Sequence, residues 1–127
     1  MLAEHDAIVT IAVKDIEKAK QFYEGTLGLK PTSRAEEGTL SYQTARSTIF
    51  VYPSQFAGTN QATAVTWIVD DIEAIVQELK AKGVAFEHYE GLPNTELKGD
   101  LHVAGDHKLA WFKDPDGNIH ALANGNR

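Results

Sequence analysis

Cysteine is absent from all 127 residues of the chain, which excludes disulfides, thiolate nucleophiles and cysteine-ligated metals. No apolar run approaches the ~18 residues of a transmembrane helix, so we expect no membrane association. Residues 1–10 have no basic segment followed by an apolar run, so we expect no signal peptide and a cytoplasmic protein. The chain has only 12 Lys and Arg residues but 18 Asp and Glu residues, so its net charge is −6. Because phosphate binding needs a basic patch, we expect no nucleic-acid partner.

The sequence repeats itself at a distance of 56 residues. Residues 8–17 (IVTIAVKDIE) align without a gap on residues 64–73 (AVTWIVDDIE), with six of ten positions identical. A unit of this length that occurs only twice is not a solenoid repeat. We therefore predict a single domain of two similar modules that share one core. The domain is residues 1–127, with module one at about 6–54, a linker at about 55–62 and module two at about 63–123.

Each module is predicted to follow the order βαβββ. A strand rich in Ile, Val and Thr leads to Asp15 or Asp71, whose carboxylate can accept the free N–H groups of a first helical turn. Apolar residues at helical spacing follow each aspartate and stop at Gly28 or Gly83. The expected strands are 7–13, 29–34, 38–44 and 47–52 in module one, and 64–69, 84–89, 108–113 and 118–123 in module two.

Two segments of the second module are expected to be irregular. Residues 91–106 are polar and contain glycine, and we predict a long loop there. Loops of that length are uncommon in compact domains and often serve as lids or binding loops. Residues 114–117 (DPDG) are a strong turn signal, because proline fixes one dihedral angle and glycine permits a positive one. The last two strands should therefore form a hairpin.

Several short motifs carry a family resemblance. They are 13–15 (VKD), 22–29 (FYEGTLGL), 69–71 (VDD) and 111–118 (WFKDPDGN). With the duplicated βαβββ order, they make the chain resemble the vicinal oxygen chelate superfamily of glyoxalases, extradiol dioxygenases, fosfomycin-modifying enzymes and bleomycin-binding proteins. The resemblance implies an α+β fold in which two modules curl into a barrel-like mixed sheet, with helices outside and the ligand on the concave face. It is similar to a bacterial glyoxalase/bleomycin-resistance-like branch, for which a homodimer is implied.

The same resemblance implies four metal-ligand positions, and none of them carries a ligating side chain here. The first-strand positions, seven residues before each capping aspartate, are Ile8 and Ala64, and the last-strand position is Ala121. The fourth lies within 49–52, which has no carboxylate or imidazole. We therefore expect no bound metal and no other cofactor. Without the metal, the Lewis acid of glyoxalase and dioxygenase chemistry is missing.

The histidines leave other chemistries open. His102, Asp106 and His107 are close enough in sequence to form an unorthodox metal site. By strand alternation, His120 should face the helices as a core histidine with a hydrogen-bond partner. In a metal-free enzyme, Lys113 or His120 would be the acid or base.

Aromatic and small polar residues on the inner strand faces form the expected ligand site, because ligand pockets combine apolar walls with a few polar groups. Thr10 and Thr66 share the strand parity of Ile8 and Ala64 and should look into the concavity, whereas Trp67 should face the helices. The aromatic residues could instead pack at a module or subunit interface. The candidate ligand-binding residues are Thr10, Tyr42, Phe50, Tyr52, Asn60, Thr66, Trp111 and Lys113.

The sequence favours a small-molecule binding protein that sequesters an organic compound, since this function needs no catalytic residue. The alternative is a lyase, isomerase or dioxygenase-like enzyme that uses a non-standard metal site or metal-free acid/base residues. A protein-interaction subunit is a third class, and it predicts a filled concavity.

Overall fold

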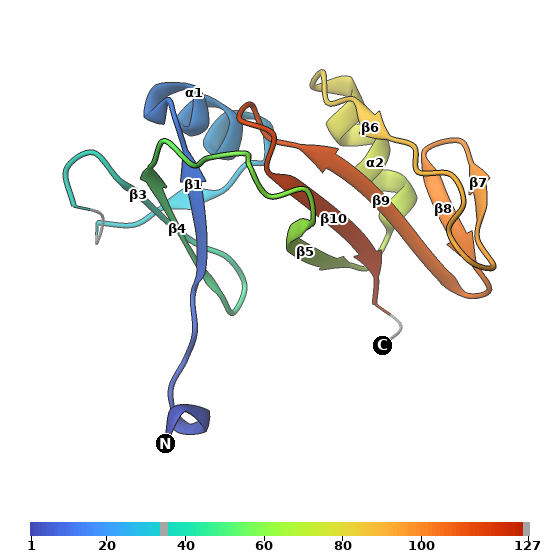
Figure 1. The fold of residues 1–127 in the computed structure, drawn as a ribbon, viewed down its shortest axis with the longest axis horizontal. Coiled ribbons are helices and arrows are strands. Elements are labelled where there is room, and N and C mark those ends of the chain that lie inside the picture. The colour runs from blue at the N-terminus through green and yellow to red at the C-terminus, as the bar shows by residue number, and fades with distance from the viewer. Residues whose placement is uncertain (34–35, 126–127) are drawn as a thin grey trace. The chain divides into compact units, whose positions relative to one another are not determined.

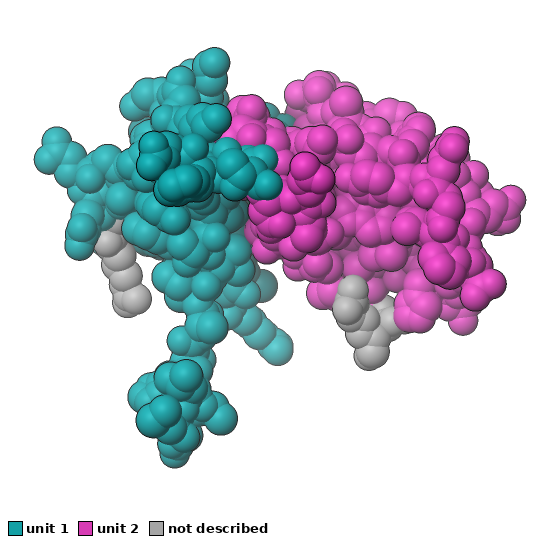
Figure 2. Space-filling view, in the orientation of Figure 1, with its two compact units in different colours: residues 1–59 teal, residues 60–127 magenta. Residues whose placement is uncertain are grey.

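The computed structural model describes residues 1–33 and 36–125. The chain divides into two compact units, residues 1–59 and 60–127, which Figure 2 shows in different colours. Each unit has its own curled, open sheet of mixed strand direction and its own helical segment (Figure 1). The α+β fold class is therefore confirmed. None of the helices in the described part of the chain is long and apolar enough to cross a membrane.

Unit 1 is built on a four-stranded sheet in the order β1-β4-β3-β2, in which only the β1–β4 pair is parallel. Its β2 is shorter than predicted, although the Thr32 N–H that follows it still donates to the Ser41 carbonyl at 2.8 Å. Arg34 of that prediction lies outside the described residues. The elements are η1 (Leu2–Glu4), β1 (Val9–Val13), α1 (Ile16–Lys20), η2 (Gln21–Thr26), β2 (Lys30–Pro31), β3 (Leu40–Gln43) and β4 (Thr48–Pro53).

The helical segment of unit 1 starts where the sequence predicts. Asp15 Oδ1 accepts the N–H groups of Glu17 and Lys18 at 3.0 and 3.2 Å, so the aspartate caps the first turn. The segment begins as α1 and continues as a π-helix, η2. Tyr23 of η2 is fully buried, and its ring stacks on that of Tyr42 at 6.2 Å. This contact places the helical segment against one face of the sheet.

The prediction that the Tyr42 side chain lies on the concave, ligand-binding face of the sheet is wrong. The register pairs Tyr42 with Ile49 and the preceding Ser41 with Phe50, so Tyr42 and Phe50 lie on opposite faces. The Tyr42 hydroxyl donates to Glu24 Oε2 at 3.0 Å, on the helix side. Burial raises the pKa of Tyr42, and the hydrogen bond to Glu24 adds to the rise. Tyr42 is therefore part of the unit 1 core.

Replacing Tyr42 by phenylalanine should lower the free energy of unfolding by about 1 kcal/mol, because the hydroxyl that donates to Glu24 is lost while the ring is kept. Urea unfolding of the Tyr42→Phe variant checks this. Tyr52→Phe is the matched control, since Tyr52 is 36% exposed and should be within about 0.5 kcal/mol of the wild type. Equal stability of both variants would show that the buried hydroxyl contributes nothing.

Unit 2 has a six-stranded sheet. Five strands follow the order β5-β10-β9-β8-β7, and β6 also pairs with β9. The β5–β10 pair is parallel and the others are antiparallel. The elements are β5 (Thr63–Val69), α2 (Ile72–Ala81), β6 (Phe86–Glu87), β7 (Glu96–Lys98), β8 (Leu101–Ala104), β9 (His107–Lys113) and β10 (Ile119–Asn124).

The ends of α2 and the last hairpin form as predicted. Asp71 Oδ1 accepts the Ala74 N–H at 3.1 Å at the start of α2. At its end, Gly83 takes φ +93°, and the N–H groups of Gly83 and Val84 donate to Lys80 and Leu79, which is the Schellman pattern. In the β9–β10 turn, the buried Asp114 accepts three N–H donors, two from the backbone and one from the Asn118 amide.

The prediction of a long loop over residues 91–106 is wrong. The segment contains β7 and β8, which form an antiparallel hairpin around a turn at Gly99 and Asp100. The hairpin extends the sheet beyond β9 through the β8–β9 pair. Its first strand has only three residues, and all of them are exposed. The sequence of this strand therefore lacks the alternation of apolar and polar residues that marks a half-buried strand. Among the described residues, module two therefore has two more strands than module one.

Candidate functional site

Helix α2 covers one face of the unit 2 sheet. The other face is not covered by this helix, and we call it the open face. Lys108 of β9 donates to Glu73 of α2 at 2.6 Å, which identifies the covered side. Trp111 is three positions from Lys108 and therefore points to the open face. The register places Thr66, Ala121, Trp111 and Glu87 in one row across β5, β10, β9 and β6 on that face.

Three aromatic rings form a cluster on the open face. The Trp111 ring lies 4.8 Å from His102 of β8 and 5.2 Å from Tyr89, and both contacts are edge-to-face. The Tyr89 and His102 rings are 5.9 Å apart. Such contacts add about 0.5–1.5 kcal/mol per pair beyond the burial of area. The cluster therefore holds Trp111 against a preformed wall.

A recess of about 320 Å³ lies beside this cluster. Trp111 forms part of its wall, and the indole N–H donates to Thr63 Oγ1 at 3.1 Å, which fixes the ring plane. The volume is in the range of small-molecule pockets, and the wall is mostly apolar with an amide and a hydroxyl. The lining residues are Gln61, Ala62, Thr63, Tyr89, Leu92, Trp111 and Ile119.

A pair of opposite charges stands next to the aromatic wall. Lys113 Nζ lies 3.6 Å from Glu87 Oε1, and both side chains are partly exposed. Burial raises the pKa of Tyr89, and the negative charge of Glu87 raises it further. The Tyr89 hydroxyl therefore stays protonated and can donate to a ligand.

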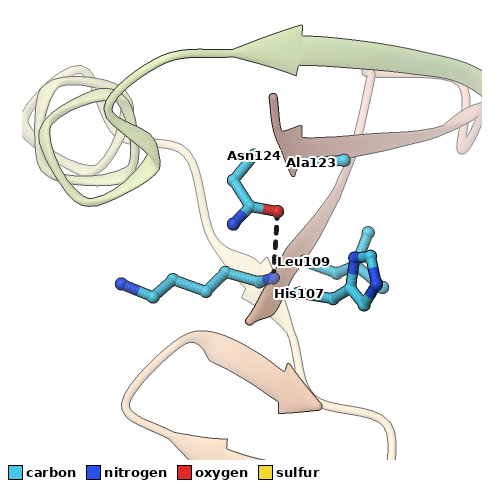
Figure 3. A pocket seen from close by; sticks show the side chains of 5 residues that line it. His107, Leu109, Ala123 and Asn124 are labelled. Atoms are coloured by element: carbon cyan, nitrogen blue, oxygen red, sulfur yellow. Dashed lines mark hydrogen bonds between the residues drawn. The ribbon is translucent and has the colours of Figure 1, made fainter. Parts of the chain in front are cut away.

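Figure 3 shows a second recess, of about 200 Å³, at the other end of the β9–β10 pair. The Lys108 backbone N–H donates to Asn124 Oδ1 at 3.2 Å, and Asn124 Nδ2 donates to the Asp106 carbonyl at 2.7 Å. The Asn124 amide is thus engaged by the chain itself. The Asn124 amide stabilises the β8–β9 turn through these two hydrogen bonds. This recess therefore offers fewer free polar groups to a ligand than the first.

Unit 1 also has an open face, opposite to its helical segment. Thr10 pairs with Phe50 across β1 and β4, and the Phe50 ring stacks on Tyr52 at 5.9 Å with an interplanar angle of 8°. Thr10 and Tyr52 are exposed and Phe50 is half-buried. Three of the predicted ligand-binding residues therefore share this face.

The covered face of unit 2 holds His120 and Trp67, as predicted. His120 is 0% exposed, and its Nδ1 accepts the Trp67 indole N–H at 3.0 Å. Its ring also stacks on Phe112 at 5.0 Å. Burial lowers the pKa of His120 to about 4. The ring is therefore a neutral core group, and a substrate on the open face has no access to it.

The structure places two of the family's metal-ligand positions and also tests the metal site proposed from His102, Asp106 and His107. Ala64 lies in β5, and Ala121 lies on the open face between Thr66 and Trp111. Within residues 1–33 and 36–125, no three His, Asp or Glu side chains gather in a way that could hold a metal ion. His102, Asp106 and His107 thus form no such cluster, since His102 is buried among the aromatic rings while the other two are exposed.

The predicted site residues separate into two groups. Thr66, Trp111 and Lys113 lie on or beside the open face of unit 2, and Asn60 shapes its edge by accepting the Ala62 N–H at 3.0 Å. Thr10, Phe50 and Tyr52 belong to unit 1. Sequence reasoning missed most of the recess. The signal for Tyr89 and Leu92 was an aromatic and an apolar residue in an otherwise polar segment. The missed lining residues are Gln61, Ala62, Thr63, Tyr89, Leu92 and Ile119.

These features define a class of protein, an α+β chain of two related modules with a preformed aromatic recess of small-molecule size. The chain belongs to the glyoxalase/bleomycin resistance protein/dioxygenase superfamily, whose family model matches residues 7–122. The resemblance to the vicinal oxygen chelate superfamily is thereby confirmed. A comparison with curated proteins found no match.

Solved structures share the fold at low sequence identity. The fosfomycin resistance protein FosX from Listeria monocytogenes has a TM-score of 0.71 at 15% identity, covering 96% of this chain and 93% of that one. TnmS3, an antibiotic binding protein from Streptomyces sp. CB03234, has a TM-score of 0.64 at 22% identity, covering 96% and 98%. An integron cassette protein from V. cholerae has a TM-score of 0.65 at 20% identity, covering 96% and 95%. At these identities the likeness shows the fold alone.

Acid should destabilise the protein through His120. Its pKa is about 4 in the folded state and 6.5 in the unfolded state, so between these values only the unfolded chain binds the proton. The stability contribution is complete above pH 6.5 and should fall by about 2–3 kcal/mol as pH drops to 4. Urea unfolding over this pH range measures the loss. His120→Leu should show a smaller pH dependence, and an unchanged slope in that variant would contradict the assignment.

Proposed function

We propose that the chain is a small-molecule binding protein of the bleomycin-resistance type, which holds an organic compound on the open face of unit 2. The observation that carries the proposal is the recess of about 320 Å³ beside Trp111. Its aromatic wall is fixed on two sides, by Thr63 and by His102, before any ligand arrives. A preformed wall reduces the ordering that binding would otherwise require.

The composition of the recess supports an uncharged or weakly polar ligand with a flat apolar part. Trp111 and Tyr89 supply aromatic surface, and Leu92 and Ile119 supply aliphatic surface. The lining residues with polar side-chain groups are Gln61, Thr63 and Tyr89. The Lys113–Glu87 pair is at the edge, where a polar substituent of the ligand could reach it. This is the mixture of apolar walls and a few polar groups that small-molecule sites use.

The binding function is proposed to need neither a metal nor a catalytic residue. Ala121, at the family's last ligand position, contributes only a methyl group to the face that carries Trp111. Two structural neighbours, an antibiotic binding protein and a fosfomycin resistance protein, are in keeping with sequestration or resistance. The cytoplasmic location and the homodimer are parts of the same proposal. So is a role for Thr10, Phe50 and Tyr52 as ligand contacts of unit 1.

The Trp111→Ala variant should bind the uncharged dye Nile red at least about tenfold more weakly than the wild type, because the central aromatic surface of the recess is lost. Fluorescence titration measures the dissociation constants. Phe56→Ala is the matched control, since Phe56 is a 68% exposed aromatic residue of unit 1 that lines neither recess. Equal losses in both variants, or no loss in Trp111→Ala, would contradict the proposed site.

A further inference from the structure

The connection between β6 and β7 carries part of the recess wall and is tied to the β7–β8 hairpin. Tyr89 and Leu92 of this connection line the recess. One tie is the hydrogen bond from the Tyr89 backbone N–H to His102 Nε2, at 2.9 Å. The other joins His88 Nε2 to Asp100 Oδ1 at 2.8 Å. The position of this wall therefore depends on two side chains of the hairpin.

The Tyr89 contact fixes the tautomer of His102. A backbone N–H can only donate, so Nε2 must be the acceptor and the neutral ring carries its proton on Nδ1. Nδ1 is buried beside the Leu109 backbone, outside hydrogen-bond geometry, and has no partner in the part of the chain that the structure describes. A leucine would fill this space without a buried unsatisfied N–H. Core packing alone thus does not account for a histidine at this position.

His102 also contacts both aromatic walls of the recess. Its ring meets Trp111 edge-on at 4.8 Å and Tyr89 at 5.9 Å. The backbone of Tyr89 and the rings of Tyr89 and Trp111 are therefore placed by one residue. His102 itself is 1% exposed and is not among the lining residues of the recess.

We infer that His102 is a positioning residue for the ligand recess, which holds the Tyr89–Leu92 wall against Trp111 through its unprotonated Nε2 and makes ligand binding sensitive to acid. The inference rests on the proposed function. Protonation places a second N–H on Nε2, facing the Tyr89 N–H. Two donors cannot bond to each other, so the wall is released.

The charges around His102 set the direction of the pH effect. Burial lowers the pKa of His102 below 6.5, and the nearby His88 lowers it further. Asp100 lies between His88 and Lys80, at 2.8 and 2.7 Å, so its charge is already paired. Glu87 and Lys113 pair with each other beside Tyr89. The recess should therefore stay formed at pH 6.5 and be lost only at lower pH, as pH falls through the lowered pKa of His102.

Four proteins separate this role from a structural one: wild type, His102→Gln, His102→Leu and His88→Gln. Glutamine can offer an oxygen near the position of Nε2 and does not titrate in this range, whereas leucine offers no acceptor. Nile red affinity is measured from about pH 8 to about pH 5, a range that starts above the pKa of an ordinary histidine and extends below it, because the pKa of His102 is lowered. Exchange of the Tyr89 amide proton is measured by NMR in the same samples.

We expect wild type and His88→Gln to lose affinity by about fivefold on acidification, the equivalent of one hydrogen bond. His102→Gln should match the wild type at high pH and show little loss at low pH. In His102→Leu the dye should bind weakly at every pH, and the Tyr89 amide should exchange faster. A pH profile in His102→Gln that follows the wild type, or an unchanged Tyr89 amide in His102→Leu, would overturn the inference. If the wild type bound no dye, the proposed function would fail, and the Tyr89 amide would still decide whether His102 positions the wall.

Discussion

Strand alternation is the constraint on which the rest of the molecule depends. Each sheet buries one face under a helical segment that begins at a capping aspartate, Asp15 or Asp71. Because successive side chains point to opposite faces, every strand must divide its residues between that core and the open face. In unit 2 the division sends Trp67 and His120 to the core and Trp111 to the open face. The same rule that stabilises the fold therefore supplies the surface for a ligand.

The second module differs from the first by the β7–β8 hairpin, and the aromatic recess depends on this addition. His102 lies on β8, beyond the strands that the two modules share, and it reaches both Trp111 and Tyr89. The described residues of unit 1 include no corresponding hairpin, and its open face carries Thr10 beside the stacked pair of Phe50 and Tyr52. The two units thus present different open faces, and the β7–β8 hairpin accounts for the difference.

Local chemistry determined which features could be predicted from the sequence. The caps at Asp15 and Asp71 and the hairpin at residues 114–117 depend on neighbouring atoms, so composition and spacing were sufficient. Tyr42 was assigned to the wrong face, because in a strand a one-residue shift exchanges inside and outside. The recess could not be predicted, since it depends on a non-local contact between Tyr89 and His102 across a hairpin of short strands.

Native mass spectrometry tests the central claim most directly. The protein would be purified from cells grown with ample Zn, Mn, Ni and Fe, and its mass would be compared with that of the bare chain. The account predicts a mass that equals the chain alone or the chain with an organic adduct, and the adduct should be missing from Trp111→Ala protein. A stoichiometric metal ion that survives desalting would contradict the account, because Ile8, Ala64 and Ala121 cannot hold it and the described residues form no alternative cluster.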